Sequence, residues 1–332
     1  MDSESTFINT QRKEKAHGKY CTKKGTLPSR KAQDLESTFK SFGSKTKNKF
    51  QSMEEKQMNI TKDMIIEELT NRGYVVAEQT CIKNGIEVIG LAVKKSEDEK
   101  VVPTIYPEDI IKGAYERDLT VAEVVDSLIP VIESRPTFDV ERFTDPEYIT
   151  SHVHIGVQKE GTEELVKRQS PFEGIEEYLY VADEMDGQGF SVKLKPHMLE
   201  CAGLKAEGVF KIAEVVNHEE FTAKPLMDVI SGMLGEDFGG DCEGIAPMYV
   251  LSNKSNMKGA SAMLDKKGIG ELADRIGVHE FLLLPSSIHE CILVPKVGDM
   301  DMEMFENMVR EVNETTVDPL ERLVDRAYLL TA

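Results

Sequence analysis

Residues 248–264, MYVLSNKSNMKGASAML, and residues 281–295, FLLLPSSIHECILVP, decide the fold of this chain. Each stretch consists of two short apolar runs separated by a polar turn, and a short helix is expected between the two stretches. Apolar runs of this length on either side of turn-forming residues are typical of antiparallel hairpins. The two stretches together therefore predict an antiparallel sheet and not a parallel sheet with helices on both faces.

The same mixture of hairpins and helices continues upstream. Apolar runs at 74–83 and 86–95 flank Asn84 and Gly85, a pair that indicates a hairpin because both turn residues must accept positive φ. Further strands are expected at 177–185 and 190–195, and helices after Asn59 or Thr61, after Thr120, over 206–216 and over 225–234. Residues 137–175 are expected to form a mostly helical connector, and residues 317–330 a short helix. A helix before 317 should carry Phe305, Met308, Val309 and Val312 on one face.

These elements predict the α+β class: mainly antiparallel sheet segments packed with amphipathic helices, preceded by a disordered basic arm. We expect the arm at 1–57, an N-terminal α+β region at 58–235 and a C-terminal α+β region at 245–332. The Gly-rich acidic segment 235–244, GEDFGGDCEG, would join the last two regions. These regions form either two bodies or one continuous body.

Charge also separates the arm from the rest of the chain. Residues 1–50 carry 12 Lys and Arg against 5 Asp and Glu, a net charge of +7, so the other residues carry −26 to reach the total of −19. The arm is poor in aliphatic residues and cannot bury enough apolar surface to fold. It is a solvated tail, an extension upstream of a start at Met53 or Met58, or a segment that attracts nucleic-acid phosphates. The acidic remainder repels phosphates, so nucleic acid would bind only through the arm.

Composition favours a cytoplasmic protein. The chain has 40% hydrophobic residues and no Trp, and none of its apolar runs approaches the ~20 residues that span a bilayer. The start of the sequence lacks the pattern of a secretory signal. Five cysteines without a C-x-x-C pair suit a reducing compartment. We expect no membrane association.

The polar stretch of the second hairpin contains the candidate site residues Ser286, Ser287, His289 and Glu290. A catalytic triad requires a serine, a histidine and a carboxylate hydrogen-bonded in space beside an oxyanion hole, which makes Ser287, His289 and Glu290 the catalytic candidates. Contact with a ligand or partner is the second interpretation, and it adds Asn253 in the polar loop of the first stretch to Ser286, Ser287 and His289. Ordinary turn chemistry is the third interpretation.

Cofactor and metal patterns are incomplete in this sequence. Residues 268–273, GIGELA, match the loose dinucleotide pattern G-x-G-x-x-A, but polar residues precede them where that pattern needs a strand. His197 and Cys201 are four residues apart, whereas a structural zinc site needs a set of four ligands. The acidic segment 236–243 lacks the alternating ligand positions of a calcium loop. We expect no cofactor and no metal.

Several segments resemble an uncharacterised bacterial family from Firmicutes, domain of unknown function 5688. They are PTIYPEDI, DVERFTD, FSVKLKPHMLECAGL and the two stretches quoted first. The resemblance covers about residues 59–330 and leaves the basic arm outside. It implies no activity and no catalytic residues.

Two classes of function therefore remain. The first is a cytoplasmic, non-enzymatic protein-interaction or regulatory protein that binds another protein. The alternative is a hydrolase or transferase with a site around Ser287, His289 and Glu290. A site in a concave pocket would favour the enzyme, whereas a convex surface would favour the binding protein.

Overall fold

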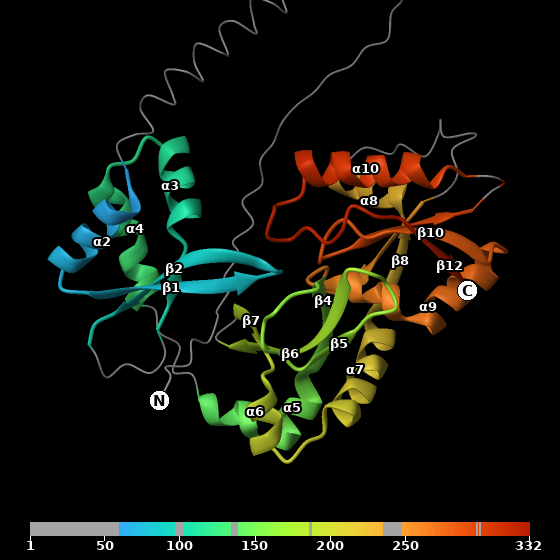
Figure 1. The fold of residues 1–332 in the computed structure, drawn as a ribbon, viewed down its shortest axis with the longest axis horizontal. Helices are drawn as coiled ribbons and strands as arrows, with labels where there is room; N and C mark the ends of the chain where they lie inside the picture. Colours follow the sequence, from blue (N-terminus) through green and yellow to red (C-terminus); the bar gives the residue numbers. More distant parts are fainter. Residues whose placement is uncertain are drawn as a thin grey trace, which may run out of the picture. The chain divides into compact units, whose positions relative to one another are not determined.

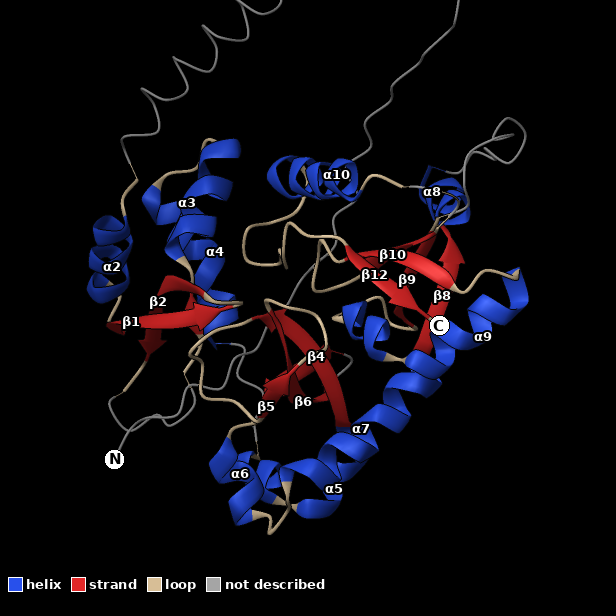
Figure 2. Ribbon diagram, turned by 45° about the vertical axis from the view of Figure 1, so that its right-hand side comes forward, coloured by secondary structure: helices blue, strands red, loops and turns tan. Residues whose placement is uncertain are grey.

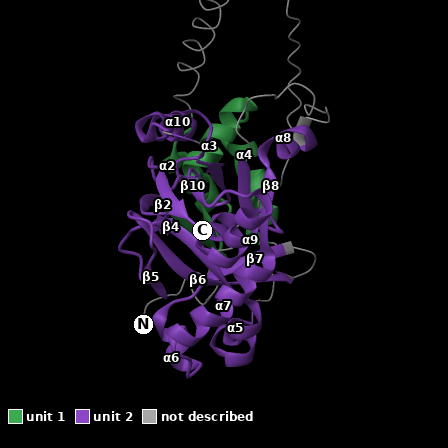
Figure 3. Ribbon diagram, turned by 90° about the vertical axis from the view of Figure 1, so that its right-hand side faces the viewer, with its two compact units in different colours: residues 1–79, 89–136 green, residues 80–88, 137–332 purple. Residues whose placement is uncertain are grey.

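The computed structural model describes residues 60–96, 102–133, 139–185, 188–234, 248–296, 298 and 300–332. Their contacts divide the chain into two compact units, which Figure 3 colours separately. Unit 1 draws on residues 1–79 and 89–136, and unit 2 on residues 80–88 and 137–332. The predicted arm and the predicted joint at 235–244 lie outside the described residues. The division between 58–235 and 245–332 stays a prediction.

Unit 1 combines a three-stranded sheet in the order β1-β2-β3 with helices (Figure 1). Thr61, one of the two caps that the sequence allows, caps its first helix by accepting a hydrogen bond from the backbone N of Met64. Side chains from helices and strands form one core, in which Ile65, Leu91 and Val125 are fully buried. The elements are α2 (Lys62–Asn71), β1 (Val75–Lys83), β2 (Ile86–Lys94), β3 (Thr104–Ile105), α3 (Pro107–Glu116) and α4 (Val121–Glu133).

The turn between β1 and β2 belongs to unit 2 and confirms the Asn-Gly prediction. Asn84 has φ 49° and Gly85 has φ 75°, the left-handed values that such a turn requires. The Asn84 side chain is buried. Its Oδ1 accepts from the backbone N of Lys159 at 2.8 Å, and its Nδ2 donates to the backbone O of Arg322 at 2.5 Å. The turn is thereby bonded to two distant segments of unit 2.

The first sheet of unit 2 has the strand order β4-β6-β5, with β7 also paired to β6. Helices α5, α6 and α7 cover one face (Figure 2), where Ile155, Leu179 and Phe210 are buried. The predicted helical connector at 137–175 is wrong, because this segment contains two strands of the sheet. The elements are η2 (Val140–Thr144), α5 (Pro146–His152), β4 (Val153–Lys159), β5 (Lys167–Gln169), β6 (Ile175–Met185), β7 (Gln188–Lys193), α6 (Pro196–Cys201) and α7 (Ala206–Glu220).

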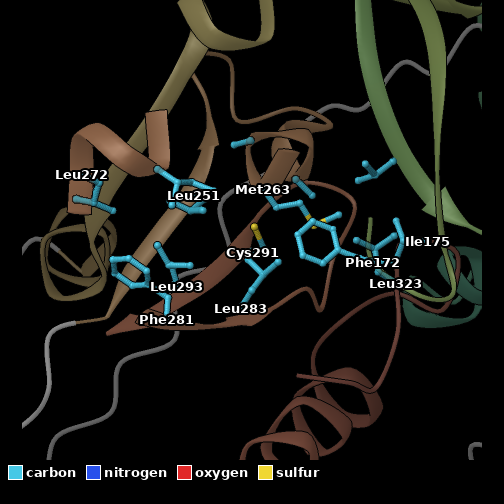
Figure 4. Packing of buried hydrophobic residues seen from close by; sticks show 14 of the residues in the cluster. Phe172, Ile175, Leu251, Met263, Leu272, Phe281, Leu283, Cys291, Leu293 and Leu323 are labelled. Carbon is cyan, nitrogen blue, oxygen red and sulfur yellow. The ribbon is translucent and has the colours of Figure 1, made fainter. Parts of the chain in front are cut away.

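The second sheet of unit 2 has the order β12-β10-β11-β9-β8, and its neighbouring strands are antiparallel. Both faces are covered, which explains the unbroken apolar run 281–284. Phe281 and Leu283 pack in the core beneath η3 and α9 (Figure 4), whereas Leu282 and Leu284 pack with α10. The elements are β8 (Phe221–Pro225), α8 (Leu226–Leu234), β9 (Tyr249–Asn253), η3 (Gly259–Leu264), α9 (Lys266–Ile276), β10 (Glu280–Leu284), β11 (Cys291–Pro295), α10 (Met302–Thr315) and β12 (Tyr328–Thr331).

Of the two stretches predicted to form hairpins, 248–264 and 281–295, only the second does so. The second forms the β10–β11 hairpin, as predicted. The first does not form a hairpin, because residues 259–264 form the 3-10 helix η3, which is buried against the second sheet. The helix predicted over 317–330 is also wrong, since this segment ends in β12. In both places tertiary packing overrides a weak local pattern.

The antiparallel sheets and their packed helices confirm the α+β class. Over the residues that the structure describes, no helix combines the length and the apolar character needed to cross a membrane.

Candidate functional site

Ser287 and His289 lie close together, but not as a nucleophile and its base. The Oγ of Ser287 accepts a hydrogen bond from the backbone N of His289 at 3.1 Å. The imidazole Nδ1 accepts from the backbone N of Lys258 at 3.1 Å, and Nε2 lies 3.2 Å from Oε1 of Glu321. Because Nδ1 accepts, the proton of a neutral ring is on Nε2, facing this carboxylate. Both ring nitrogens are therefore used, and the side chain of Glu290 is exposed.

The other predicted contact residues hold the backbone around them. Asn253 is buried, and its Oδ1 accepts from the Oγ of Ser255 at 3.0 Å and from the backbone N of Met257 at 3.2 Å. Its Nδ2 donates to the carbonyl of Met257 at 2.8 Å. The backbone carbonyl of Ser286 accepts from the backbone N of Leu323 at 3.0 Å. These polar groups therefore fix the backbone of the loop at 253–259 and of the segment around Ser286.

The backbone of the 253–259 loop is in the left-handed region at two residues that are not glycine. Asn256 and Lys258 have φ 54° and 53°, which is uncommon for residues other than glycine. A methyl group at Gly259 would overlap the Oγ of Ser252 and the backbone N of Asn253, so no larger residue fits there without movement. Unusual backbone conformations that are held by many contacts occur often at functional sites. In this loop they place the side chain of Lys258.

Lys258 reaches the face of the first sheet opposite its helices. The strand register puts His154 beside Tyr180, Gly156 beside Tyr178, and Tyr180 beside Lys193 on this face. A Cβ at Gly156 would lie 2.5 Å from the ring of Tyr178, so the ring occupies the space that a side chain would need. The rings of Tyr178 and Tyr180 therefore lie side by side on this face, and the two residues are only 2% and 5% exposed.

Two ammonium groups lie over these two rings. Nζ of Lys258 is 4.5 Å from the ring centroid of Tyr180 and donates to Oγ of Ser191 at 2.7 Å. Nζ of Lys193 is 4.9 Å from the centroid of Tyr178, and the two ring centroids are 6.0 Å apart. Contacts of a cation with an aromatic face are favourable at these distances. We call Lys258, Lys193, Tyr178, Tyr180 and Ser191 the Lys258 site.

The surroundings of this site change its titration. Burial, with a smaller contribution from the positive charge of Lys193 and against the opposing effect of Glu163, lowers the pKa of Lys258 to about 8. Burial raises the pKa of Tyr178 and of Tyr180 above the usual tyrosine value. A substantial fraction of Lys258 is therefore neutral near pH 8, while both tyrosines stay protonated.

A separate surface cavity of about 610 Å³ lies elsewhere in unit 2. Asn313, 2% exposed, donates to Oδ1 of Asp325 at 2.6 Å, and its own Oδ1 has no hydrogen-bond partner among the described residues. Both carboxylates and cations line the cavity, so it has no strong preference for one sign of charge. It is lined by Lys159, Glu160, Glu173, Gly174, Asn313, Glu314, Arg322, Leu323, Val324, Asp325 and Arg326.

Metal ligands do not cluster in the described part of the chain: no group of three or more His, Cys, Asp or Glu side chains there could hold a metal ion. The dinucleotide-like sequence GIGELA lies within α9, which begins at Lys266, and not in a loop that follows a strand. A phosphate-binding turn of the Rossmann type is therefore not formed at these residues.

Sequence reasoning missed the Lys258 site for an identifiable reason. Lys258 lies in a polar loop, and the sheet that it reaches includes β4, which falls in the segment 137–175 where the sequence predicts a mostly helical connector. The alternation of Val153, Ile155 and Val157 with polar or small residues is the signal that could have revealed this strand.

Comparison with known proteins gives a family without a function. A model described as a family of unknown function, DUF5688, matches residues 33–331. The match begins earlier than residue 59, the start expected from the resemblance, and so includes part of the basic arm. No curated protein and no solved structure matches the chain.

Proposed function

Because the chain belongs to DUF5688, a family without an assigned function, we propose its function from the geometry: it is a cytoplasmic, non-enzymatic protein that binds another protein. The binding surface is the outer part of α10, and the partner segment is a basic amphipathic helix. One observation carries the proposal, namely an exposed apolar row along this helix.

Met304, Met308 and Val312 form this row, which we call the α10 stripe. Their spacing of four residues places them on one side of the helix. They are 50%, 42% and 44% exposed, whereas Phe305 and Val309 of the neighbouring row are buried against the second sheet. The spacing of the apolar residues predicts Met308 and Val312 on the same face as the buried pair, Phe305 and Val309. Instead, the apolar surface of α10 is wider than the part that the sheet covers.

The composition of the stripe suits an adaptable contact with a helix. Methionine side chains are flexible and polarisable, and they recur on surfaces that accept apolar helix faces. Glu303, Glu311 and Glu314 are exposed on the same helix, so carboxylates accompany the stripe. A partner helix with leucines on one face and lysines along its borders would match both features.

The predicted site residues have a different place in this proposal. Asn253, Ser287 and His289 organise the backbone around Lys258 and do not themselves meet the partner. The alternative function, a hydrolase or transferase around Ser287, His289 and Glu290, stays a prediction. No observed contact between the Ser287 hydroxyl and the imidazole favours it.

The test uses a defined peptide. A fluorescent amphipathic helix with leucines on one face and lysines on the other is titrated with the protein, and a second peptide carries glutamates in place of the lysines. We expect micromolar binding of the basic peptide and at least tenfold weaker binding of the acidic one. Replacing Met304, Met308 and Val312 by Gln should weaken binding at least tenfold, because Gln keeps the helix and removes the apolar surface.

A matched control replaces exposed apolar residues on another helix. Ile212 and Val215 on α7 are 38% and 58% exposed, and their change to Gln should leave the affinity unaltered. Equal binding by the α10 variant and the wild type would refute the proposal, as would equal affinity for the basic and the acidic peptide. Circular dichroism of each variant establishes that the fold is retained.

A further inference from the structure

We infer that the Lys258 site binds a small oxyanion, a carboxylate or a phosphate, at the ammonium groups of Lys258 and Lys193. This binding function is independent of the α10 stripe. Its ligand class follows from the charges and hydrogen-bond donors that the first sheet of unit 2 and the 253–259 loop bring together.

The first observation is an unmatched positive charge. Lys193 donates to Oε2 of Glu163 at 2.7 Å, and Lys167 on the same face lies 3.0 Å from Oε2 of Glu176. Lys258 donates instead to a neutral hydroxyl, that of Ser191, and lies on an aromatic ring. A cation that is taken out of water is costly unless an anion accompanies it. A bound oxyanion would supply the missing charge.

The second observation is a set of hydrogen-bond donors without acceptors. No described residue forms a hydrogen bond with the hydroxyl of Tyr178 or Tyr180, residues that are 2% and 5% exposed, and neither hydroxyl oxygen is fully enclosed by the protein. The Lys258 ammonium has three N–H groups, and one of them is used by Ser191. Tyrosine hydroxyls and ammonium groups together present donors, which is the pattern that carboxylate and phosphate oxygens require.

The third observation is that Lys258 is held in place before any ligand binds. Its left-handed backbone is fixed by the hydrogen bond to Nδ1 of His289, whose Nε2 faces Glu321. Gly259 follows at a position where a side chain would overlap its neighbours. An ammonium that is already oriented loses little conformational entropy when it binds an anion.

The charged groups around Lys258 determine the pH dependence. Lys193 opposes its protonation and Glu163 favours it, whereas Tyr178 and Tyr180 are neutral. His154 stacks on Tyr180 and lies 3.5 Å from Glu220, which offsets its charge when it is protonated. Since burial and Lys193 lower the pKa of Lys258 to about 8, the cation that holds the anion is lost above that pH. Affinity should therefore be higher at pH 7 than at pH 9.5.

The experiment measures binding of inorganic phosphate and of citrate to the full chain by calorimetry, at pH 7 and pH 9.5. We expect saturable binding of at least one probe at pH 7 and at least fivefold weaker binding at pH 9.5. Phosphate is more highly charged at the higher pH, so its own titration cannot cause this loss. Binding of phosphate alone identifies a phosphoryl ligand, and binding of citrate alone identifies a carboxylate.

Four variants locate the ligand. Lys258→Met should weaken binding at least tenfold, and Tyr178→Phe and Tyr180→Phe, which keep the rings, about threefold or more. Lys211→Met changes an exposed lysine on α7 and should have no effect. The inference is overturned if the wild type binds neither probe saturably, or if folded Lys258→Met and both phenylalanine variants bind as the wild type does. The phenylalanine variants decide the matter if Lys258→Met does not fold.

Discussion

Asn84 has two structural roles: its backbone adopts the positive φ of the hairpin turn, and its side chain bonds two distant segments. Its positive φ satisfies the hairpin turn, which is a local demand that the sequence pair Asn84-Gly85 already indicates. Its side-chain amide also bonds the backbone of Lys159 and Arg322, which are 75 and 238 residues away in the sequence. An amide suits this position because its oxygen accepts from the first segment while its nitrogen donates to the second.

Substitution of Asn84 by glycine or by alanine distinguishes the contribution of the turn from that of the side-chain hydrogen bonds. Asn84→Gly keeps the turn and loses both side-chain hydrogen bonds, leaving the N–H of Lys159 and the carbonyl of Arg322 with one partner fewer each. We expect it to lower the free energy of unfolding by about 2 kcal/mol, measured by urea denaturation. Asn84→Ala should cost about 1 kcal/mol more, because alanine also strains the left-handed turn. An Asn84→Gly variant as stable as the wild type would show that the amide contributes nothing.

Helix α9 explains a glycine pattern that resembles a nucleotide-binding motif. Gly268 lies in the first turn of the helix, where a Cβ would be 2.8 Å from the ring of Phe221 in β8. Gly277 ends the helix in the left-handed conformation, with φ 71°. The close approach to β8 therefore accounts for Gly268, the first glycine of the pattern, and the helix end accounts for Gly277, which lies outside it. The second glycine of the pattern, Gly270, has open space where its Cβ would lie.

The N-terminus of α9 depends on Asp265. Its Oδ1 accepts from the backbone N of Gly268 at 3.0 Å, and its Oδ2 lies 2.8 Å from Nδ1 of His218. Asp265→Ala removes the helix cap and the bond to α7, so we expect a loss of about 2 kcal/mol in thermal or urea unfolding. Asp265→Asn is the matched control. It keeps an oxygen for the cap and should cost less than about 1 kcal/mol, and equal losses in the two variants would contradict a capping role.

At the scale of the whole molecule, net charge and buried charge act in different ways. The chain carries −19 overall, which describes its average surface. The Lys258 site is a local exception, with two ammonium groups over neighbouring tyrosine rings. An acidic net charge therefore does not exclude an anion-binding site, because partly buried charges at short range outweigh distant ones that solvent and salt screen.

Stability should rise with pH in the alkaline range because of Lys258. Its pKa is about 8 in the folded protein, against 10.5 for an exposed lysine. Between these pH values the unfolded chain binds a proton that the folded chain does not, so the free energy of unfolding increases with pH. We expect a gain of about 1 to 2 kcal/mol from about pH 8 to about pH 10. At higher pH the raised pKa values of Tyr178 and Tyr180 act in the opposite direction.

Urea denaturation at a series of pH values measures this gain. Lys258→Met lacks the titrating group, so the difference in unfolding free energy between wild type and variant should change by the same amount, about 1 to 2 kcal/mol, over this range. A constant difference across the range would show that the folded protein does not perturb Lys258. Lys211→Met, on the exposed side of α7, should follow the wild type throughout.

The sequence by itself determined the α+β class and the Asn84-Gly85 and β10–β11 hairpins, because each depends on residues that are neighbours in the chain. The sequence did not determine strand β4, although its apolar residues alternate, or helix η3, whose conformation is decided by packing. Only the tertiary structure decided the Lys258 site. Lys258 and Ser191 are 67 residues apart, and strand register together with a left-handed loop brings them within hydrogen-bond distance. No local pattern encodes such a register.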